Sequence, residues 1–156
     1  MPLKTGDKAP SFKLFDTEKK EVSLDDFKGK NVVLLFFPQS FTGVCTKELC
    51  STRDDIAFYQ DLNAQVLAIS VDSVFTLGKF KEDQQLNFPL LSDFNKETSR
   101  AYESLYEDWI LGMKGVSKRS AFVIDKNGTI QYAEVLESAG DLPNFDAVKQ
   151  TLNSLG

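Results

Sequence analysis

Histidine is absent from this chain of 156 residues. The chain alone therefore cannot form a serine–histidine triad, a cysteine–histidine pair or a histidine-bearing metal site. Only two cysteines are present, and they are more typical of redox-active or buried thiols than of a structural disulfide. Nothing in the spacing of the carboxylates indicates a zinc site. We expect neither a metal nor a cofactor, so any activity must come from thiols, hydroxyls, amides or cations.

An excess of basic charge and long apolar runs are also lacking. The net charge is −5 at pH 7, whereas a nucleic-acid-binding surface is basic. No apolar run is long enough to span a bilayer, and no charged-then-apolar signal segment is present at the start. We expect no nucleic-acid partner, no membrane partner and a cytoplasmic location. The length and the 42% apolar content are those of a single globular domain over residues 1–156.

Strand patterns and helical patterns alternate along the chain. Buried-strand patterns at 31–37 and 65–71 are each followed by a helical pattern. Asn127 and Gly128 separate two apolar runs, which predicts an antiparallel hairpin. These patterns predict an α/β fold with parallel βα units, in which a mixed central sheet is flanked by helices.

The remaining segments have weaker patterns. We expect a short edge hairpin around 16–20, a helical turn from Ser23 to Phe27 and a final helix over 144–155. Four further expectations concern the middle of the chain: a helix over 73–86, a strand over 88–91, a helix over 95–105 with Ala101 and Leu105 inward, and a long loop over 106–118.

Both cysteines lie just after the first buried strand. Pro38 ends that strand, and a helical pattern from Cys45 to Tyr59 follows a short loop, so Cys45 falls in the first turn of a helix. Free amides and the helix dipole favour a thiolate over a thiol there. Thr42 lies three residues earlier, where its hydroxyl can cap the helix and reach the sulfur. The pattern indicates a site for an attacking thiolate.

These residues resemble the peroxiredoxin family. Pro38, Thr42 and Cys45 match its Pro-x-x-x-Thr-x-x-Cys signature without insertion, and Arg119 before Ser-Ala-Phe-Val-Ile-Asp resembles its second active-site position. The opening residues resemble that family too: Gly6, Ala9, Pro10 and Phe12. The sequence looks most like the alkyl hydroperoxide reductase E type, whereas Cys50 is placed as in the bacterioferritin-comigratory, or Q, type. The resemblance implies a thioredoxin-like peroxiredoxin fold.

The resemblance also implies a role for each matched residue. Cys45 would attack the terminal oxygen of a hydroperoxide and become a sulfenic acid. The Thr42 hydroxyl and the fork of Arg119 would stabilise charge on the peroxide oxygens, and Pro38 would shield the sulfur from water. Bland alternatives stay open: Cys45 as a small buried hydrophobe, Thr42 as a helix cap only, and Arg119 as a surface arginine with Arg53 in its place.

Two further residues on the same helix are open to two interpretations each. Glu48 either orients an arginine or compensates the helix dipole. Cys50 either resolves the sulfenic acid as an intrachain disulfide or is an inert packed cysteine, with an external thiol as the resolving group. Residues five apart in a helix have Cα atoms roughly 8–9 Å apart, and a disulfide tolerates about 7 Å. A Cys45–Cys50 bond therefore requires the first helical turns to unwind.

The favoured interpretation is a thiol-dependent peroxidase that reduces hydrogen peroxide and organic hydroperoxides. By resemblance, its reductant is a thioredoxin-like protein or a low-molecular-weight thiol, and the chain is expected to form a homodimer. The alternative is a non-enzymatic thioredoxin-fold module for redox sensing or binding, in which oxidation of Cys45 changes a contact with a partner. Catalytic turnover with a reductant separates the two.

Overall fold

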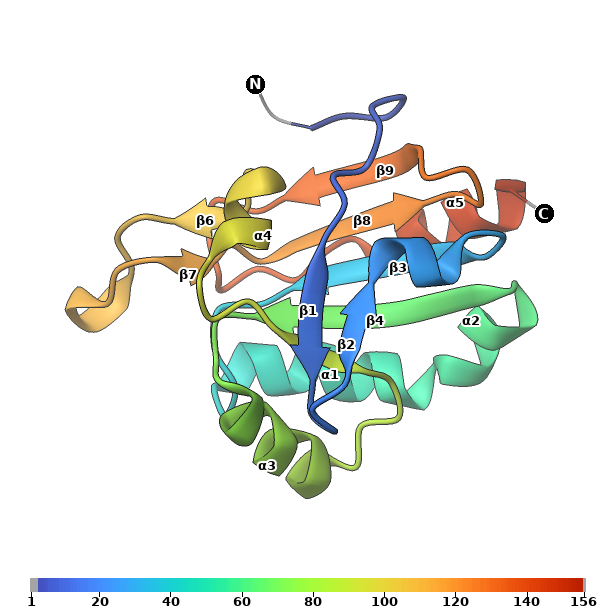
Figure 1. The fold of residues 1–156 in the computed structure, drawn as a ribbon. Coiled ribbons are helices and arrows are strands. Elements are labelled where there is room, and N and C mark those ends of the chain that lie inside the picture. Colours follow the sequence, from blue (N-terminus) through green and yellow to red (C-terminus); the bar gives the residue numbers. More distant parts are fainter. Residues whose placement is uncertain (1–2, 156) are drawn as a thin grey trace.

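The computed structural model describes residues 3–155 (Figure 1). In chain order the elements are β1 (Lys13–Asp16), β2 (Glu21–Ser23), the 3-10 turn η1 (Leu24–Phe27), β3 (Asn31–Phe36), α1 (Gly43–Asp54), α2 (Ile56–Asp61), β4 (Ala64–Ser70), α3 (Val74–Gln84), β5 (Leu90–Ser92), α4 (Glu97–Ala101), β6 (Leu105–Tyr106), the 3-10 turn η2 (Ile110–Gly112), β7 (Val116–Ser117), β8 (Ser120–Ile124), β9 (Ile130–Val135) and α5 (Phe145–Leu155).

Seven strands form one mixed sheet in the order β2-β1-β5-β4-β3-β8-β9. The three central strands β5, β4 and β3 are parallel, and the outer strands join them by antiparallel pairing. The predicted βα units, the edge hairpin β1–β2 and the β8–β9 hairpin at Asn127 are all confirmed. The mixed central sheet flanked by helices is therefore the architecture that the sequence predicts.

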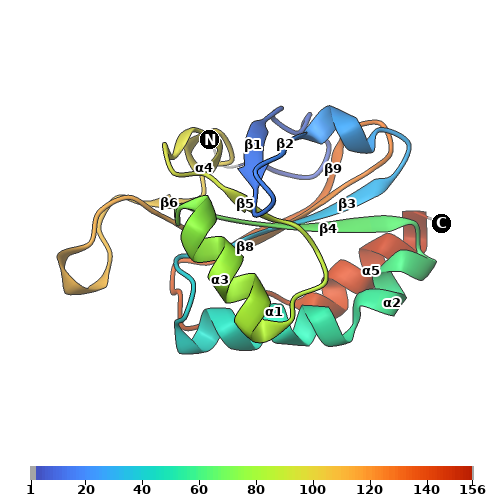
Figure 2. The ribbon, with the colours of Figure 1, turned by 60° about the horizontal axis from the view of Figure 1, so that its bottom comes forward.

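Side chains of β3 alternate between two cores. Val33 and Leu35 pack in a core with residues of α1, α2, α3 and α5. Val32, Leu34 and Phe36 pack in a second core with the N-terminal segment and η1. Figure 2 shows α1, α2, α3 and α5 on one face of the sheet and α4 on the other. Since both faces are covered, the strand is a continuous apolar run in the sequence.

The helical pattern that follows the first buried strand is divided between two helices. α1 ends and α2 begins on either side of Asp55, so the prediction of one helix from Cys45 to Tyr59 is wrong. The carboxylate of Asp55 accepts a hydrogen bond from Nζ of Lys149 in α5 at 2.8 Å. Asp55 itself has a φ of −98° and a ψ of 9°, outside the helical range, and the helical spacing of apolar residues does not encode this break.

The helix expected over 95–105 is much shorter than predicted. α4 has five residues, Ala101 is exposed and Leu105 lies in β6, so the predicted inward face is wrong. The carboxylate of Asp93 accepts two amides from the first turn of α4, at 3.1 and 2.6 Å. Glu103 has a φ of +51°, which turns the chain away from the helix. A buried carboxylate and a left-handed residue therefore set both ends.

Two neighbouring expectations need smaller corrections. The strand expected over 88–91 begins at Leu90, two residues later. The segment 106–118, expected as a loop, contains β7 and η2, and β7 pairs with β6 as a two-stranded hairpin. In Figure 1 this hairpin projects from the side of the molecule. Among residues 3–155, no helix combines the length and apolar character needed to cross a bilayer.

Candidate active site

Cys45 lies where the strand β3 passes into the helix α1. The chain leaves β3 at Phe36, continues through the buried Pro38 and enters α1 at Gly43, so Cys45 is the third residue of the helix. Its side chain is fully buried in the core on the helical face of the sheet. The predicted place of Cys45 in the first turn is therefore confirmed.

The loop before α1 is fixed by a carboxylate at the end of the neighbouring strand. The amide and the hydroxyl of Ser40 both donate to Oδ2 of Asp72, at 2.8 and 2.9 Å. Phe41 follows with a φ of +66°, and its ring packs edge-on against Phe80 of α3 at 5.1 Å between centroids. A non-glycine residue holds such a backbone only where its surroundings determine it. The Ser40–Asp72 contact thus sets the path into the helix.

Thr42 is the N-cap residue of α1, as predicted, but its side chain makes no capping hydrogen bond. Instead its hydroxyl donates to the carbonyl oxygen of Gln39 at 2.9 Å. The expectation of a side-chain cap is therefore wrong. Because the hydroxyl proton is engaged by Gln39, the oxygen of Thr42 can accept a hydrogen bond from another group.

Arg119 is buried, not a surface arginine, and it contacts the sulfur directly. Its Nη2 donates to Sγ of Cys45 at 3.1 Å, and its Nε donates to the carbonyl of Ala139 at 2.9 Å. The antiparallel register that pairs Phe36 with Ser120 brings Arg119 to the end of β3, where the active-site loop begins. Arg53 is engaged elsewhere and does not take its place.

Glu48 completes a buried cluster with Cys45 and Arg119. It lies one turn after Cys45 on α1, and its Oε1 accepts from Nη1 of Arg119 at 2.9 Å. Burial raises the pKa of Glu48 to about 7, although the neighbouring guanidinium lowers it. Burial lowers the pKa of Arg119, but the charges of Glu48 and Cys45 outweigh that effect and raise it. The contact favours the interpretation that Glu48 orients an arginine.

A cavity of about 330 Å³ adjoins this cluster. Thr42, Val44 and Arg119 line it on the side of the cysteine, and Trp109, Ile110 and Ala139 line it from distant segments. Neither Ile110 nor the carbonyl of Ala139 was predicted from the sequence. Both lie in segments without periodicity or motif, and only the folded chain brings them beside α1.

Cys50 lies apart from the cluster on the same helix. It is half-buried, it is not in a disulfide, and its thiol donates to Oε1 of Gln84 at 3.4 Å. Nearby, Arg53 donates to the carboxylate of Asp54 at 3.0 Å and to the carbonyl of Gln84. The structure therefore brings Cys45, Thr42 and Arg119 together, with Pro38 buried before them, and leaves Cys50 outside.

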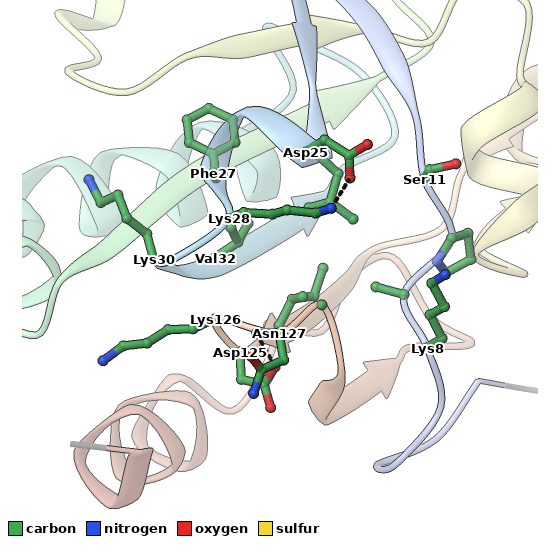
Figure 3. A pocket seen from close by; sticks show the side chains of 15 residues that line it. Lys8, Ser11, Asp25, Phe27, Lys28, Lys30, Val32, Asp125, Lys126 and Asn127 are labelled. Atoms are coloured by element: carbon green, nitrogen blue, oxygen red, sulfur yellow. Dashed lines mark hydrogen bonds and ion pairs between the residues drawn. The ribbon is translucent and has the colours of Figure 1, made fainter.

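A second cavity, of about 540 Å³, lies near the start of β3, at Val32 (Figure 3). Lysines line it, among them Lys28, which is ion-paired with Asp25 at 3.9 Å. None of the residues predicted for catalysis lines this cavity. Across residues 3–155 no cluster of three metal-ligating side chains occurs. The chemistry that the sequence predicts thus belongs to the smaller cavity.

Comparison with known proteins agrees with this geometry. Residues 5–133 match the AhpC/TSA family. The chain is 39% identical over 134 residues to a putative peroxiredoxin of Mycobacterium tuberculosis, covering 85% of each. It is 40% identical over 154 residues to a mitochondrial thioredoxin-dependent peroxide reductase of Bos taurus, covering 92% of this chain and 56% of that protein's length.

Solved structures show the same relationship. Peroxidoxin BcpB from Mycobacterium tuberculosis superposes with a TM-score of 0.87 at 30% identity and 99% coverage of both chains. A peroxiredoxin-like protein from Aquifex aeolicus superposes with a TM-score of 0.90 at 26% identity, covering 100% of this chain and 90% of the other. The predicted thioredoxin-like peroxiredoxin fold is confirmed. The chain belongs to the AhpC/TSA family and is a peroxiredoxin, a thiol-dependent peroxidase.

Proposed function

We propose that Cys45 is the peroxidatic residue of this enzyme. Its thiolate attacks the terminal oxygen of a hydroperoxide R–O–OH, the S–O bond forms as the O–O bond breaks, and Cys45 becomes a sulfenic acid. The leaving group RO⁻ takes a proton from water and departs as an alcohol, or as water where R is hydrogen. The sulfur of Cys45 is oxidised in this step, because the two electrons that reduce the O–O bond come from it.

The observation that carries this proposal is the contact of 3.1 Å between Nη2 of Arg119 and Sγ of Cys45. A guanidinium at that distance places a positive charge directly against the attacking sulfur. Arg119 is fixed by Glu48 and by the carbonyl of Ala139, so its charge is already in position when negative charge develops on the leaving oxygen. The free amides at the start of α1 support the same charge.

Thr42 and Pro38 assist in this proposal. The Thr42 oxygen accepts a hydrogen bond from the hydroperoxide O–H, since its own proton is donated to the carbonyl of Gln39. Pro38 is buried at the entrance to the loop and helps to keep water from the sulfur. Because Cys45 is fully buried, the peroxide reaches Sγ only when the surrounding side chains move slightly.

Cys50 is the resolving cysteine in this proposal. Its thiol sulfur bonds to the sulfur of Cys45 and displaces the sulfenic hydroxyl, which leaves as water, so that an intrachain disulfide forms. Cys50 is half-buried and unpaired with Cys45, so the first turns of α1 must unwind for the two sulfurs to meet. Gly43, the first residue of α1, eases that step because glycine is a poor helix former. An external thiol is the alternative resolving group.

A thioredoxin-like protein is the proposed reductant of the disulfide, as the name of the bovine relative states for that protein. A low-molecular-weight thiol is the other candidate. Since a peroxidatic thiol must be regenerated by thiols, the reducing cytoplasm is the setting that we propose. In this proposal residues 1–156 act as one domain.

A homodimer is proposed through the edge near the active site. Phe41 is 51% exposed and packs on α3, and on the same helix Phe75 is 71% exposed. Exposed aromatic residues favour a contact surface for a second copy. Sedimentation of wild type and of Phe41→Ser tests this: a dimer that dissociates in the variant is expected, and a monomeric wild type contradicts it.

Stopped-flow fluorescence of Trp109 tests the function directly. Reduced protein is mixed with one equivalent of hydrogen peroxide, and wild type is compared with Cys45→Ser and Cys50→Ser. We expect a fast phase that Cys45→Ser loses and a slower phase that Cys50→Ser loses. Absence of any phase that depends on Cys45, together with an unchanged thiol count, would contradict the peroxidase mechanism and favour the sensing or binding module.

A further inference from the structure

The cavity beside the cysteine is lined by two unlike sets of side chains. Thr42 and Arg119 line it with polar groups, which face the reacting atoms in the proposed mechanism. Trp109 and Ile110 line it with apolar side chains from a distant segment of the chain. Its volume of about 330 Å³ is that of a small-molecule site. Hydrogen peroxide needs no apolar wall, so the cavity exceeds what the smallest substrate requires.

The apolar wall is carried by a segment that is joined to the active-site loop. Trp109 and Ile110 lie between β6 and β7, and the amide of Trp109 donates to the carbonyl of Met113 at 2.7 Å. Nε2 of Gln39 donates to Sδ of Met113 at 3.2 Å. Gln39 is also the residue whose carbonyl holds the Thr42 hydroxyl. Gln39 therefore links the segment that carries the wall to the catalytic loop.

Ile110 is an exposed apolar side chain that lines the cavity. It is 58% exposed, whereas burial of an isoleucine is strongly favourable. Its neighbour Leu111 is 91% exposed but does not line the cavity. Ile110 thus offers apolar surface to whatever occupies the cavity, and Leu111 provides a matched residue that does not.

The direction of attack determines which part of a hydroperoxide meets this wall. In an in-line displacement the leaving oxygen lies opposite the sulfur, so the R group of R–O–OH extends away from Cys45. Thr42 and Arg119 take the peroxide oxygens, and R lies in the remainder of the cavity, against Trp109 and Ile110. Apolar R groups bury apolar surface there, and hydrogen peroxide has no such group.

We propose that this cavity binds the R group of compact organic hydroperoxides, aryl or branched alkyl, and that Trp109 and Ile110 determine this specificity. The inference rests on the peroxidase mechanism proposed above and adds its preferred substrate class. A volume of about 330 Å³ is at the lower end of the range of roughly 300–1,000 Å³ for ligand sites, which favours compact groups over long chains.

The test compares rate constants for oxidation of Cys45 by cumene hydroperoxide and by hydrogen peroxide. Ile110→Ser is the main variant, because it keeps Trp109 as the fluorescent reporter, and Leu111→Ser is its matched control. Trp109→Ala lacks the only tryptophan, so its oxidation is measured by quenched-flow thiol counting. Removal of one apolar contact from such a pocket changes discrimination by about tenfold. We expect Ile110→Ser and Trp109→Ala to lower the cumene hydroperoxide rate about fivefold to tenfold and to leave the hydrogen peroxide rate within about twofold.

Each outcome of this test has one meaning. Leu111→Ser should leave both rates unchanged, and tert-butyl hydroperoxide should follow cumene hydroperoxide. Equal losses with both peroxides in Ile110→Ser would show a structural effect and overturn the specificity role. No loss with either peroxide would also overturn that role. If neither peroxide oxidises Cys45 in wild type, the proposed function fails, and that result is separate from a failure of the specificity role.

Discussion

The two cysteines lie on one helix, yet their surroundings differ in every respect that governs thiol chemistry. Cys45 is fully buried and receives a hydrogen bond from a guanidinium at 3.1 Å. Cys50 is half-buried and donates to an amide oxygen at 3.4 Å. One sulfur lies against a fixed positive charge, and the other lies against a neutral amide oxygen. Position in a helix does not account for this difference. Partners from other segments of the chain, Arg119 for Cys45 and Gln84 for Cys50, produce it.

The two arginines nearest these cysteines repeat the contrast. Arg119 is 1% exposed and binds Cys45, Glu48 and a backbone carbonyl. Arg53 is partly exposed and is engaged by Asp54 and by the carbonyl of Gln84. A charge in a buried, fixed position stabilises a nearby anion far more than one that water screens. The comparison therefore supports the proposal that Cys45, and not Cys50, attacks the peroxide.

The largest effect is expected when Arg119, rather than Arg53, is replaced by lysine. Arg119→Lys keeps the charge near Glu48 but loses the fork that holds the sulfur, so the rate of Cys45 oxidation by hydrogen peroxide should fall about 10²–10³-fold. Arg53→Lys is the matched control and should change that rate less than twofold. Stopped-flow fluorescence of Trp109 measures both. Equal effects of the two substitutions would break the comparison.

We expect the buried Glu48 to make the stability of the protein depend on pH, and Glu48→Gln to remove that dependence. Burial raises the pKa of Glu48 to about 7 from 4.5, so the folded state holds a proton that the unfolded state has lost between these values. The contribution of protonated Glu48 to the free energy of unfolding is therefore fully present below about pH 4.5 and is lost as the pH rises to about 7. At about 1.4 kcal/mol for each pH unit, the loss is roughly 3 kcal/mol. Urea unfolding of both proteins from pH 5 to 7.5 measures the difference.

A stability of wild type relative to Glu48→Gln that rises over this pH range would contradict the prediction. It would mean that Arg119 holds Glu48 ionised throughout, so that the guanidinium is shared between two permanent anions. Glu48→Asp gives a further comparison, because it keeps the carboxyl group but shortens its reach to Arg119.

A smaller effect is expected at Thr42. Thr42→Val keeps the shape but removes the oxygen that is proposed to accept the hydroperoxide proton, and loss of one such hydrogen bond lowers the rate about tenfold. Thr42→Ser retains the hydroxyl and should lie within about threefold of wild type. Thr46, whose hydroxyl donates to the carbonyl of Thr42, gives the control Thr46→Val. An unchanged rate in Thr42→Val would limit Thr42 to a structural role.

The smallest effect is expected at the Ser40–Asp72 contact. Ser40→Ala removes one hydrogen bond of 2.9 Å that holds the loop before α1. Unwinding of the first turns should become easier by about 1 kcal/mol, so disulfide formation should become about fivefold faster. Ser73→Ala removes the N-cap of α3 at a similar cost and should leave that rate unchanged. Equal disulfide rates in wild type and Ser40→Ala would show that the loop does not limit resolution.

Much of the fold followed from local pattern. The continuous apolar run of β3, the helical spacing after Cys45 and the Asn-Gly turn at 127–128 each depend on neighbours in the chain, and the structure has all three elements. The exceptions have distant causes. Asp93 and Glu103 set the ends of the short α4, and Asp55, which contacts α5, lies at the break in the helix after Cys45.

The site was predictable only in part for the same reason. Pro38, Thr42, Cys45 and Arg119 were recognised because they match a family signature, not because spacing alone brings residue 119 to residue 45. The carbonyl of Ala139 carries no side-chain signal at all, since any residue can supply a carbonyl. Contacts of that kind depend on the register of β8 against β3 and appear only in the folded chain.

Peptide mass mapping after one equivalent of hydrogen peroxide tests the division of roles between the two cysteines most directly. In wild type we predict a peptide in which Cys45 and Cys50 are joined by a disulfide, and in Cys50→Ser a sulfenic acid on Cys45 that a dimedone-type reagent traps. A free Cys50 beside a persistent sulfenic acid in wild type would contradict its role as the resolving cysteine. Oxidation of Cys50 with Cys45 left reduced would contradict the account as a whole.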